Sequence, residues 1–170
     1  MNVFDFAIKM ELDGKSFYEE LARGTDIAGL RNIFTRLAGD EQKHYEVILA
    51  LKAGERPAAM ADSSSLERAK NVFEDLLARK AAPGPAKGDL EAYRRAMKLE
   101  ADSFRLYEEA AGKEALPATR DLLLRVAGEE RKHFNILENI YDFVNAPNQY
   151  LAWGEFSNLD EFRQFGRGVD

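Results

Sequence analysis

The sequence repeats one set of polar side chains at a constant offset of 89 residues. The chain has two histidines, and each ends a Glu-x-x-His pattern. A further glutamate stands thirty residues before the glutamate of each pattern. The six residues of the two copies are Glu11, Glu41, His44, Glu100, Glu130 and His133. Any fold of this chain has to accommodate both copies in the same register.

Apolar residues recur at alternating steps of three and four residues in four segments, which is the spacing of one helix face. Gly24 follows the first segment, Pro117 begins the last and Pro147 follows it. Strand patterns are weak throughout. The sequence therefore predicts an all-α protein whose long helices cover about residues 3–23, 28–53, 90–111 and 117–145.

The connections between these helices predict how they are arranged. The first two helices and the last two are joined by short links, so each pair is expected to form an antiparallel hairpin. A long crossover, about residues 54–88, joins the hairpins and contains a helical stretch of its own. One long crossover is the arrangement of ferritin-like four-helix bundles. We expect residues 1–146 to form this bundle, because 170 residues suit one domain.

The aromatic C-terminal tail, residues 147–170, is expected to pack on the bundle or against a second subunit.

The 89-residue repeat also extends beyond the six polar residues. Residues 11–22 align with 100–111 without gaps, and residues 38–41 align with 127–130. Two amphipathic helices often look alike by chance, but a register shared across both hairpins predicts a duplicated helical hairpin.

The repeated residues suit a pair of metal ions. Positions i and i+3 of a helix share one face, about 4.5 Å apart along the axis, so each Glu-x-x-His pair can aim at one point. All four glutamates fall on apolar stripes, where bare carboxylates would cost several kcal/mol each. Two divalent cations balance four carboxylates. One lone Glu-x-x-His is usually a solvated pair, whereas this doubled set matches carboxylate-bridged di-iron or di-manganese sites.

Mixed oxygen and nitrogen ligands suit iron or manganese, and zinc or cobalt could substitute.

Two tyrosines lie seven residues after Glu11 and Glu100 and are either core aromatics or donors that orient carboxylates. Small residues three positions after the same glutamates either allow close packing or leave room for an oxygen species. These four residues are Tyr18, Tyr107, Gly14 and Ser103. Four other acidic residues are expected on the outer surface, namely Asp40, Glu129, Glu20 and Glu109.

Composition excludes several other functions. The net charge of −6 argues against nucleic acid or an anionic membrane as a partner. Cysteine is absent, which excludes disulfides, thiolate nucleophiles, iron–sulfur clusters and Cys-ligated zinc. No uncharged apolar run is long enough to span a bilayer, and residues 1–10 do not look like a signal peptide. We therefore expect a cytoplasmic protein.

With its ligands placed, the chain resembles the rubrerythrin branch of the ferritin-like superfamily. The matching segments are residues 7–22, 37–48, 96–111 and 126–137. The resemblance implies two irons bridged by Glu41 and Glu130. It also implies one terminal glutamate and one histidine for each ion, often in a homodimer that reduces hydrogen peroxide. The terminal ligands would be Glu11, Glu100, His44 and His133.

Two departures from that family bear on function. Rubrerythrins typically carry a Cys-rich rubredoxin domain, so a chain without cysteine needs a separate electron-donor protein. They also usually place an extra glutamate where this chain has Ser103, which leaves six ligands in place of seven. Three alternatives to a peroxide-reducing enzyme therefore stay open. They are a ferroxidase that uses dioxygen, a metal-stabilised interaction module, and an oxygenase, for which no feature names a substrate.

Overall fold

A computed structural model of the chain describes residues 2–57, 60, 63–78 and 87–145. These residues form five α-helices and no strand, which confirms the all-α prediction. The helices are α1 (Val3–Gly24), α2 (Ala28–Lys52), α3 (Ser65–Ala78), α4 (Lys87–Lys113) and α5 (Pro117–Asn145). The helical stretch predicted within the crossover is α3. The predicted tail, residues 147–170, lies outside the described residues.

Local sequence accounts for several helix ends. The side chain of Asn2 caps α1 by accepting a hydrogen bond from the backbone amide of Phe4 at 3.2 Å. Pro117 is the first residue of α5, where its missing amide hydrogen costs nothing. After α2, Gly54 takes a positive φ of 73°. The amides of Gly54 and Glu55 then bond the carbonyls of Leu51 and Ala50, each at 3.0 Å, which is a Schellman motif.

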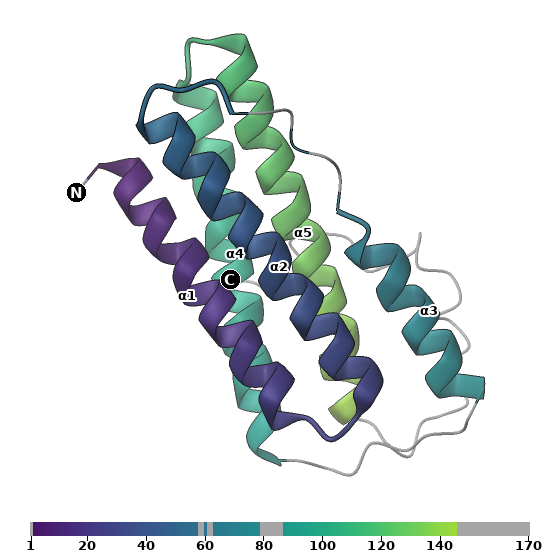
Figure 1. The fold of residues 1–170 in the computed structure, drawn as a ribbon. Helices are drawn as coiled ribbons and strands as arrows, with labels where there is room; N and C mark the ends of the chain where they lie inside the picture. The colour runs from purple at the N-terminus through teal and green to yellow at the C-terminus, as the bar shows by residue number, and fades with distance from the viewer. Residues whose placement is uncertain (1, 58–59, 61–62, 79–86, 146–170) are drawn as a thin grey trace.

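The four long helices lie side by side as a bundle, and α3 lies outside it (Figure 1). The main contacts are within the hairpins, α1 against α2 and α4 against α5. The two hairpins meet where α1 contacts α4 and α2 contacts α5. α3 packs against α2 and α5, so the crossover covers one side of the bundle. Among the described residues, no helix combines the length and apolarity needed to cross a membrane.

Two separate apolar clusters fill the bundle. One contains the C-terminal part of α1, the N-terminal parts of α2 and α4, and the C-terminal part of α5, together with α3. The other contains the opposite parts of the four long helices, together with Met60 of the crossover. Phe34 and Leu137 are fully buried in the first cluster, and Ile48 and Val126 in the second. The middle of the bundle lies between the clusters, and there its buried residues are polar.

α3 approaches α2 closely at Gly29. A Cβ atom added at Gly29 would lie 2.6 Å from Cγ1 of Val72 on α3. Such a distance cannot be tolerated without movement, and the β-branched valine side chain has few other rotamers. Gly39, on the same helix, would meet nothing within 4 Å. Alanine substitutions at the two positions can therefore distinguish the effect of helix propensity on stability from the effect of the α2–α3 contact.

We predict that Gly29→Ala lowers the free energy of unfolding by about 1–3 kcal/mol, because the added methyl overpacks the α2–α3 contact. The matched variant Gly39→Ala should raise it by about 0.5–1 kcal/mol, because alanine favours the helix. Urea denaturation of both variants checks this. Equal stabilisation by the two substitutions would contradict the close contact.

Candidate metal centre

The six repeated residues meet inside the bundle, between the two apolar clusters. One glutamate comes from each of α1 and α4, and one Glu-x-x-His pair from each of α2 and α5, where the i, i+3 spacing places both side chains on the inner face. None of the six residues is more than 3% exposed: Glu11, Glu41, His44, Glu100, Glu130 and His133. The structure thus brings the complete predicted set together.

The six residues form two overlapping groups that could each hold a metal ion. Within each group the candidate ligand atoms all lie within 4.8 Å of one another. The first group is Glu11, Glu41, His44 and Glu130, and the second is Glu41, Glu100, Glu130 and His133. Glu41 and Glu130 belong to both groups. They therefore occupy the positions from which one carboxylate could contact two ions.

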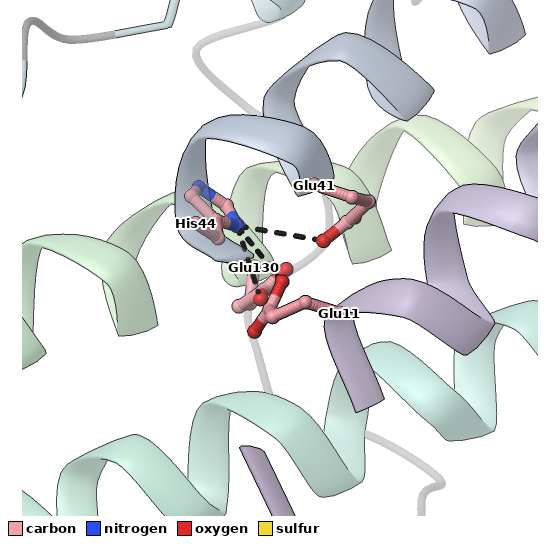
Figure 2. A group of neighbouring side chains, drawn as sticks. All are labelled: Glu11, Glu41, His44 and Glu130. Carbon is pink, nitrogen blue, oxygen red and sulfur yellow. Dashed lines mark ion pairs between the residues drawn. The ribbon is translucent and has the colours of Figure 1, made fainter. Parts of the chain in front are cut away.

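Figure 2 shows the first group, where carboxylates from three helices converge on His44. Nδ1 of His44 lies 3.4 Å from Oε2 of Glu11, 3.4 Å from Oε2 of Glu41 and 3.3 Å from Oε1 of Glu130. These separations are longer than a good hydrogen bond. The imidazole nitrogen and three carboxylates thus face one common point.

His133 repeats this arrangement in the second group. Its Nδ1 lies 3.0 Å from Oε1 of Glu41, 3.3 Å from Oε2 of Glu130 and 3.7 Å from Oε1 of Glu100. The two imidazole rings are stacked, with centroids 5.7 Å apart and planes inclined by 22°. Two neighbouring ligand sets therefore lie side by side, related by the repeat.

The predicted surface position of Asp40 and Glu129 is wrong. The two residues are 4% and 3% exposed, and each faces the outer nitrogen of a histidine. Oε2 of Glu129 lies 2.8 Å from Nε2 of His44, and Oδ2 of Asp40 lies 3.5 Å from Nε2 of His133. The Glu129 contact is a hydrogen bond, of the kind that fixes the tautomer and orientation of a metal-binding imidazole, whereas the Asp40 contact is a longer ion-pair contact.

The error has a physical cause. One residue before a core glutamate points about 100° away around the helix, which is solvent for an isolated hairpin. In the bundle, the other hairpin and the crossover cover that direction. The repeat held a usable signal, because an acidic residue precedes the core glutamate in both copies. Glu20 and Glu109 are exposed, as predicted.

The two tyrosines donate hydrogen bonds to glutamates of the opposite hairpin. The hydroxyl of Tyr18 donates to Glu100, and that of Tyr107 donates to Glu11. Burial raises the pKa of both phenols well above 10.0, and the neighbouring carboxylates, Glu100 for Tyr18 and Glu11 for Tyr107, raise it further. The phenols thus stay protonated donors. Both rings also belong to the apolar clusters, so they serve packing and orientation together.

Gly14 and Ser103 occupy equivalent positions in the repeat but act differently. Oγ of Ser103 donates to Oε1 of Glu130 at 3.0 Å. A Cβ atom at Gly14 would lie 3.6 Å from Cδ of Glu41, which is ordinary van der Waals contact. Alanine would therefore fit at position 14, whereas a larger side chain would press on Glu41. Among the described residues, Glu130 receives a serine hydroxyl and Glu41 does not.

Burial and mutual charge together raise the pKa values of four ionisable groups of the site and lower those of the two shared carboxyls, Glu41 and Glu130. Burial, followed by the charge of Glu130, raises the pKa of Glu11 and Glu100 well above 4.5. Burial would lower the pKa of His44 and His133, but the surrounding carboxylates outweigh it and raise both well above 6.5. Without cations, the shifts at these four groups all favour the protonated form.

Several buried atoms of this layer lack a hydrogen-bond partner in the described structure. They are Oε2 of Glu11, Nδ1 of His44, Oε2 of Glu130 and Nε2 of His133. A buried polar group left unpaired costs about 1–3 kcal/mol, and more when it is charged. The first three of these atoms take part in the ion-pair contacts around the two groups. Cations at the two groups would satisfy them and balance four carboxylates, so the donor set fits two divalent ions.

The fold and the site define a ferritin-like bundle with a buried carboxylate and histidine metal site. The family model described as rubrerythrin matches residues 2–141. The chain therefore belongs to the rubrerythrin family, and the match supports a di-iron protein. No curated protein and no solved structure gives a significant match.

We predict that Asp40→Asn and Glu129→Gln each weaken metal binding by about 10- to 100-fold, because each removes a charged partner that orients a histidine. Glu20→Gln and Glu109→Gln remove equivalent charges from the exposed surface and should leave affinity unchanged. Anaerobic Fe(II) titration of the four variants measures this. Equal affinities in all four would mean that the outer carboxylates do not support the site.

A second prediction concerns pH. In the folded metal-free chain the pKa values of His44, His133, Glu11 and Glu100 lie above those of the unfolded chain, so folding favours their protonated forms. The free energy of unfolding should therefore fall as the pH rises above 6.5, by about 1.4 kcal/mol per pH unit for each proton. Metal replaces these protons, so the loaded protein should not show this decline. Thermal unfolding from about pH 6 to 8 tests both forms, and a metal-free chain that gains stability would contradict the prediction.

Proposed function

We propose that this protein is a non-haem di-iron oxidoreductase that reduces hydrogen peroxide with electrons from a separate donor protein. One observation carries the proposal: in a chain of the rubrerythrin family, two candidate ligand groups share Glu41 and Glu130, and the ligand atoms of each group lie within 4.8 Å of one another. Shared carboxylates place two ions close enough to act on one substrate molecule. Reduction of one peroxide to two waters takes two electrons and two protons, and a pair of ferrous ions supplies those electrons when bound.

In this proposal the chain holds the two ions at a set spacing. Glu41 and Glu130 would be shared by the two ions, and each ion would also be held by one terminal glutamate and one histidine. The terminal ligands are Glu11 and His44 for one ion, and Glu100 and His133 for the other. Manganese is a second possible metal, and zinc or cobalt would fit the same donors as substitutes.

The surrounding residues keep these ligands in place and keep water away. Tyr18 and Tyr107 hold the terminal glutamates through hydroxyls that stay protonated. The apolar clusters on either side of the polar layer exclude solvent from it. A site of this kind restricts the reaction to small molecules such as peroxide or dioxygen.

The partners belong to the same proposal. The chain has no cysteine, so it cannot carry a Cys-ligated iron centre for internal electron delivery. A separate protein would re-reduce the site. The homodimer and the cytoplasmic location stay predictions, which sedimentation and fractionation would test.

A ferroxidase that oxidises Fe(II) with dioxygen is the second candidate, and Ser103 favours it. The position that usually carries an extra glutamate in rubrerythrins holds a serine, whose hydroxyl binds Glu130 at 3.0 Å. The site then has six candidate ligands in a nearly symmetric arrangement. A metal-stabilised interaction module is the outcome expected if bound iron reacts with neither oxidant.

We predict that protein loaded anaerobically with two Fe(II) per chain oxidises faster with hydrogen peroxide than with dioxygen. Rapid mixing with each oxidant, followed by ferric absorbance, measures the two rates. Glu41→Ala should lose the two-ion stoichiometry because it removes a ligand of both ions, whereas Glu46→Ala removes an exposed glutamate of the same helix and should keep it. Faster reaction with dioxygen would favour the ferroxidase, and two ions in Glu41→Ala would refute the shared ligand.

A further inference from the structure

The segment that leads into α3 crosses directly over the two outer carboxylates. Ser63 and Ser65 are buried, at 8% and 6% exposure, whereas Ser64 between them is exposed. The backbone amide of Ser63 donates to Oε1 of Glu129 at 2.7 Å. The hydroxyls of Ser63 and Ser65 both lie 2.5 Å from Oδ2 of Asp40, for which they are donors. Ser63 thus contacts both outer carboxylates, and Ser65, two residues later, contacts Asp40.

These contacts connect the crossover to the histidines in two steps. Glu129 contacts His44, and the same Oδ2 of Asp40 that the serines bind lies 3.5 Å from Nε2 of His133. The two serine Oγ atoms lie 2.9 Å apart, so both hydroxyls converge on the same carboxylate oxygen. Because the carboxylates are buried, the serine donors replace the water that would otherwise solvate them.

The two halves of the site are supported unequally. Asp40 receives two serine hydroxyls and, from the exposed side, Nζ of Lys43 at 3.0 Å. Glu129 receives one backbone amide on Oε1 and keeps Oε2 for His44 at 2.8 Å. The crossover occurs once in the chain, whereas the hairpin occurs twice, so it cannot support both halves in the same way.

We propose that Ser63 and Ser65 are positioning residues of the metal centre, which orient His133 through Asp40 and so make the two halves of a duplicated site unequal. This inference rests on the proposed metal centre. The serine hydroxyls hold Asp40, whose carboxylate lies at ion-pair distance from the imidazole, with Oδ2 3.5 Å from Nε2 of His133. The His44 half depends on a backbone amide and not on these hydroxyls, so it serves as an internal reference.

The two histidines allow each half to be observed separately. The imidazoles of ¹⁵N-histidine-labelled protein give two sets of NMR signals, which the variant His133→Gln assigns. Titration with diamagnetic Zn(II) then reports the occupancy of each half. In Ser65→Ala the His133 signals should need about tenfold more Zn(II), at the low end of the effect of groups that support metal ligands. The His44 signals should change much less.

Matched variants separate positioning from folding. Ser63→Ala keeps the backbone amide on Glu129 and should reproduce the selective loss at His133. Ser65→Thr keeps the hydroxyl and should restore the normal midpoint. Ser64→Ala is the control and should change neither histidine, because Ser64 is exposed and its hydroxyl accepts a hydrogen bond at 3.1 Å from the exposed Arg68 side chain.

The outcomes distinguish this inference from the metal centre itself. If neither imidazole of the unmodified chain responds to Zn(II) or Fe(II), the proposed metal centre is wrong and the positioning role falls with it. If both respond and Ser63→Ala and Ser65→Ala leave the ratio of the two midpoints unchanged, only the positioning role is overturned. Equal weakening of both halves would also overturn it, because that indicates general loosening of the crossover.

Discussion

Four carboxylates buried in one layer are the constraint on which the rest of this structure depends. A buried carboxylate costs several kcal/mol unless its charge is compensated. The bundle surrounds the layer with two imidazoles, two phenols and a serine hydroxyl, and apolar clusters close it on both sides. Even so, burial and the charge of Glu130 raise the pKa values of Glu11 and Glu100, which is the direction expected where added positive charge is favoured. Two cations would supply it.

The tyrosines and the outer carboxylates make their contacts across the two hairpins. Tyr18 of the first hairpin binds Glu100 of the second, and Tyr107 of the second binds Glu11 of the first. The outer carboxylates cross in the same way, Glu129 to His44 and Asp40 to His133. Neither copy of the repeat contains a complete site. The complete site therefore exists only where the two hairpins are paired.

Sequence spacing was sufficient to predict the six candidate ligands. It was insufficient to predict the carboxylates that contact the two histidines. Glu41 and His44 were predictable because the i, i+3 relation is a local property of one helix. The burial of Asp40 depends on residues far away in the chain, since Ser63 and Ser65 cover it from the crossover. No periodicity within α2 reports what another segment will place over it. A prediction from one helix at a time therefore put Asp40 on the surface.

The sequence by itself determined the all-α class, the duplicated hairpins, the six candidate ligands and the helix in the crossover, because helical periodicity and i, i+3 spacing are local. Only the tertiary structure decided which atoms converge, that Glu41 and Glu130 belong to both ligand groups, and that the crossover supports the halves unequally. Those features depend on how separate helices meet. The two copies of the repeat form one site, and the contacts to its two outer carboxylates differ because the chain has a single crossover.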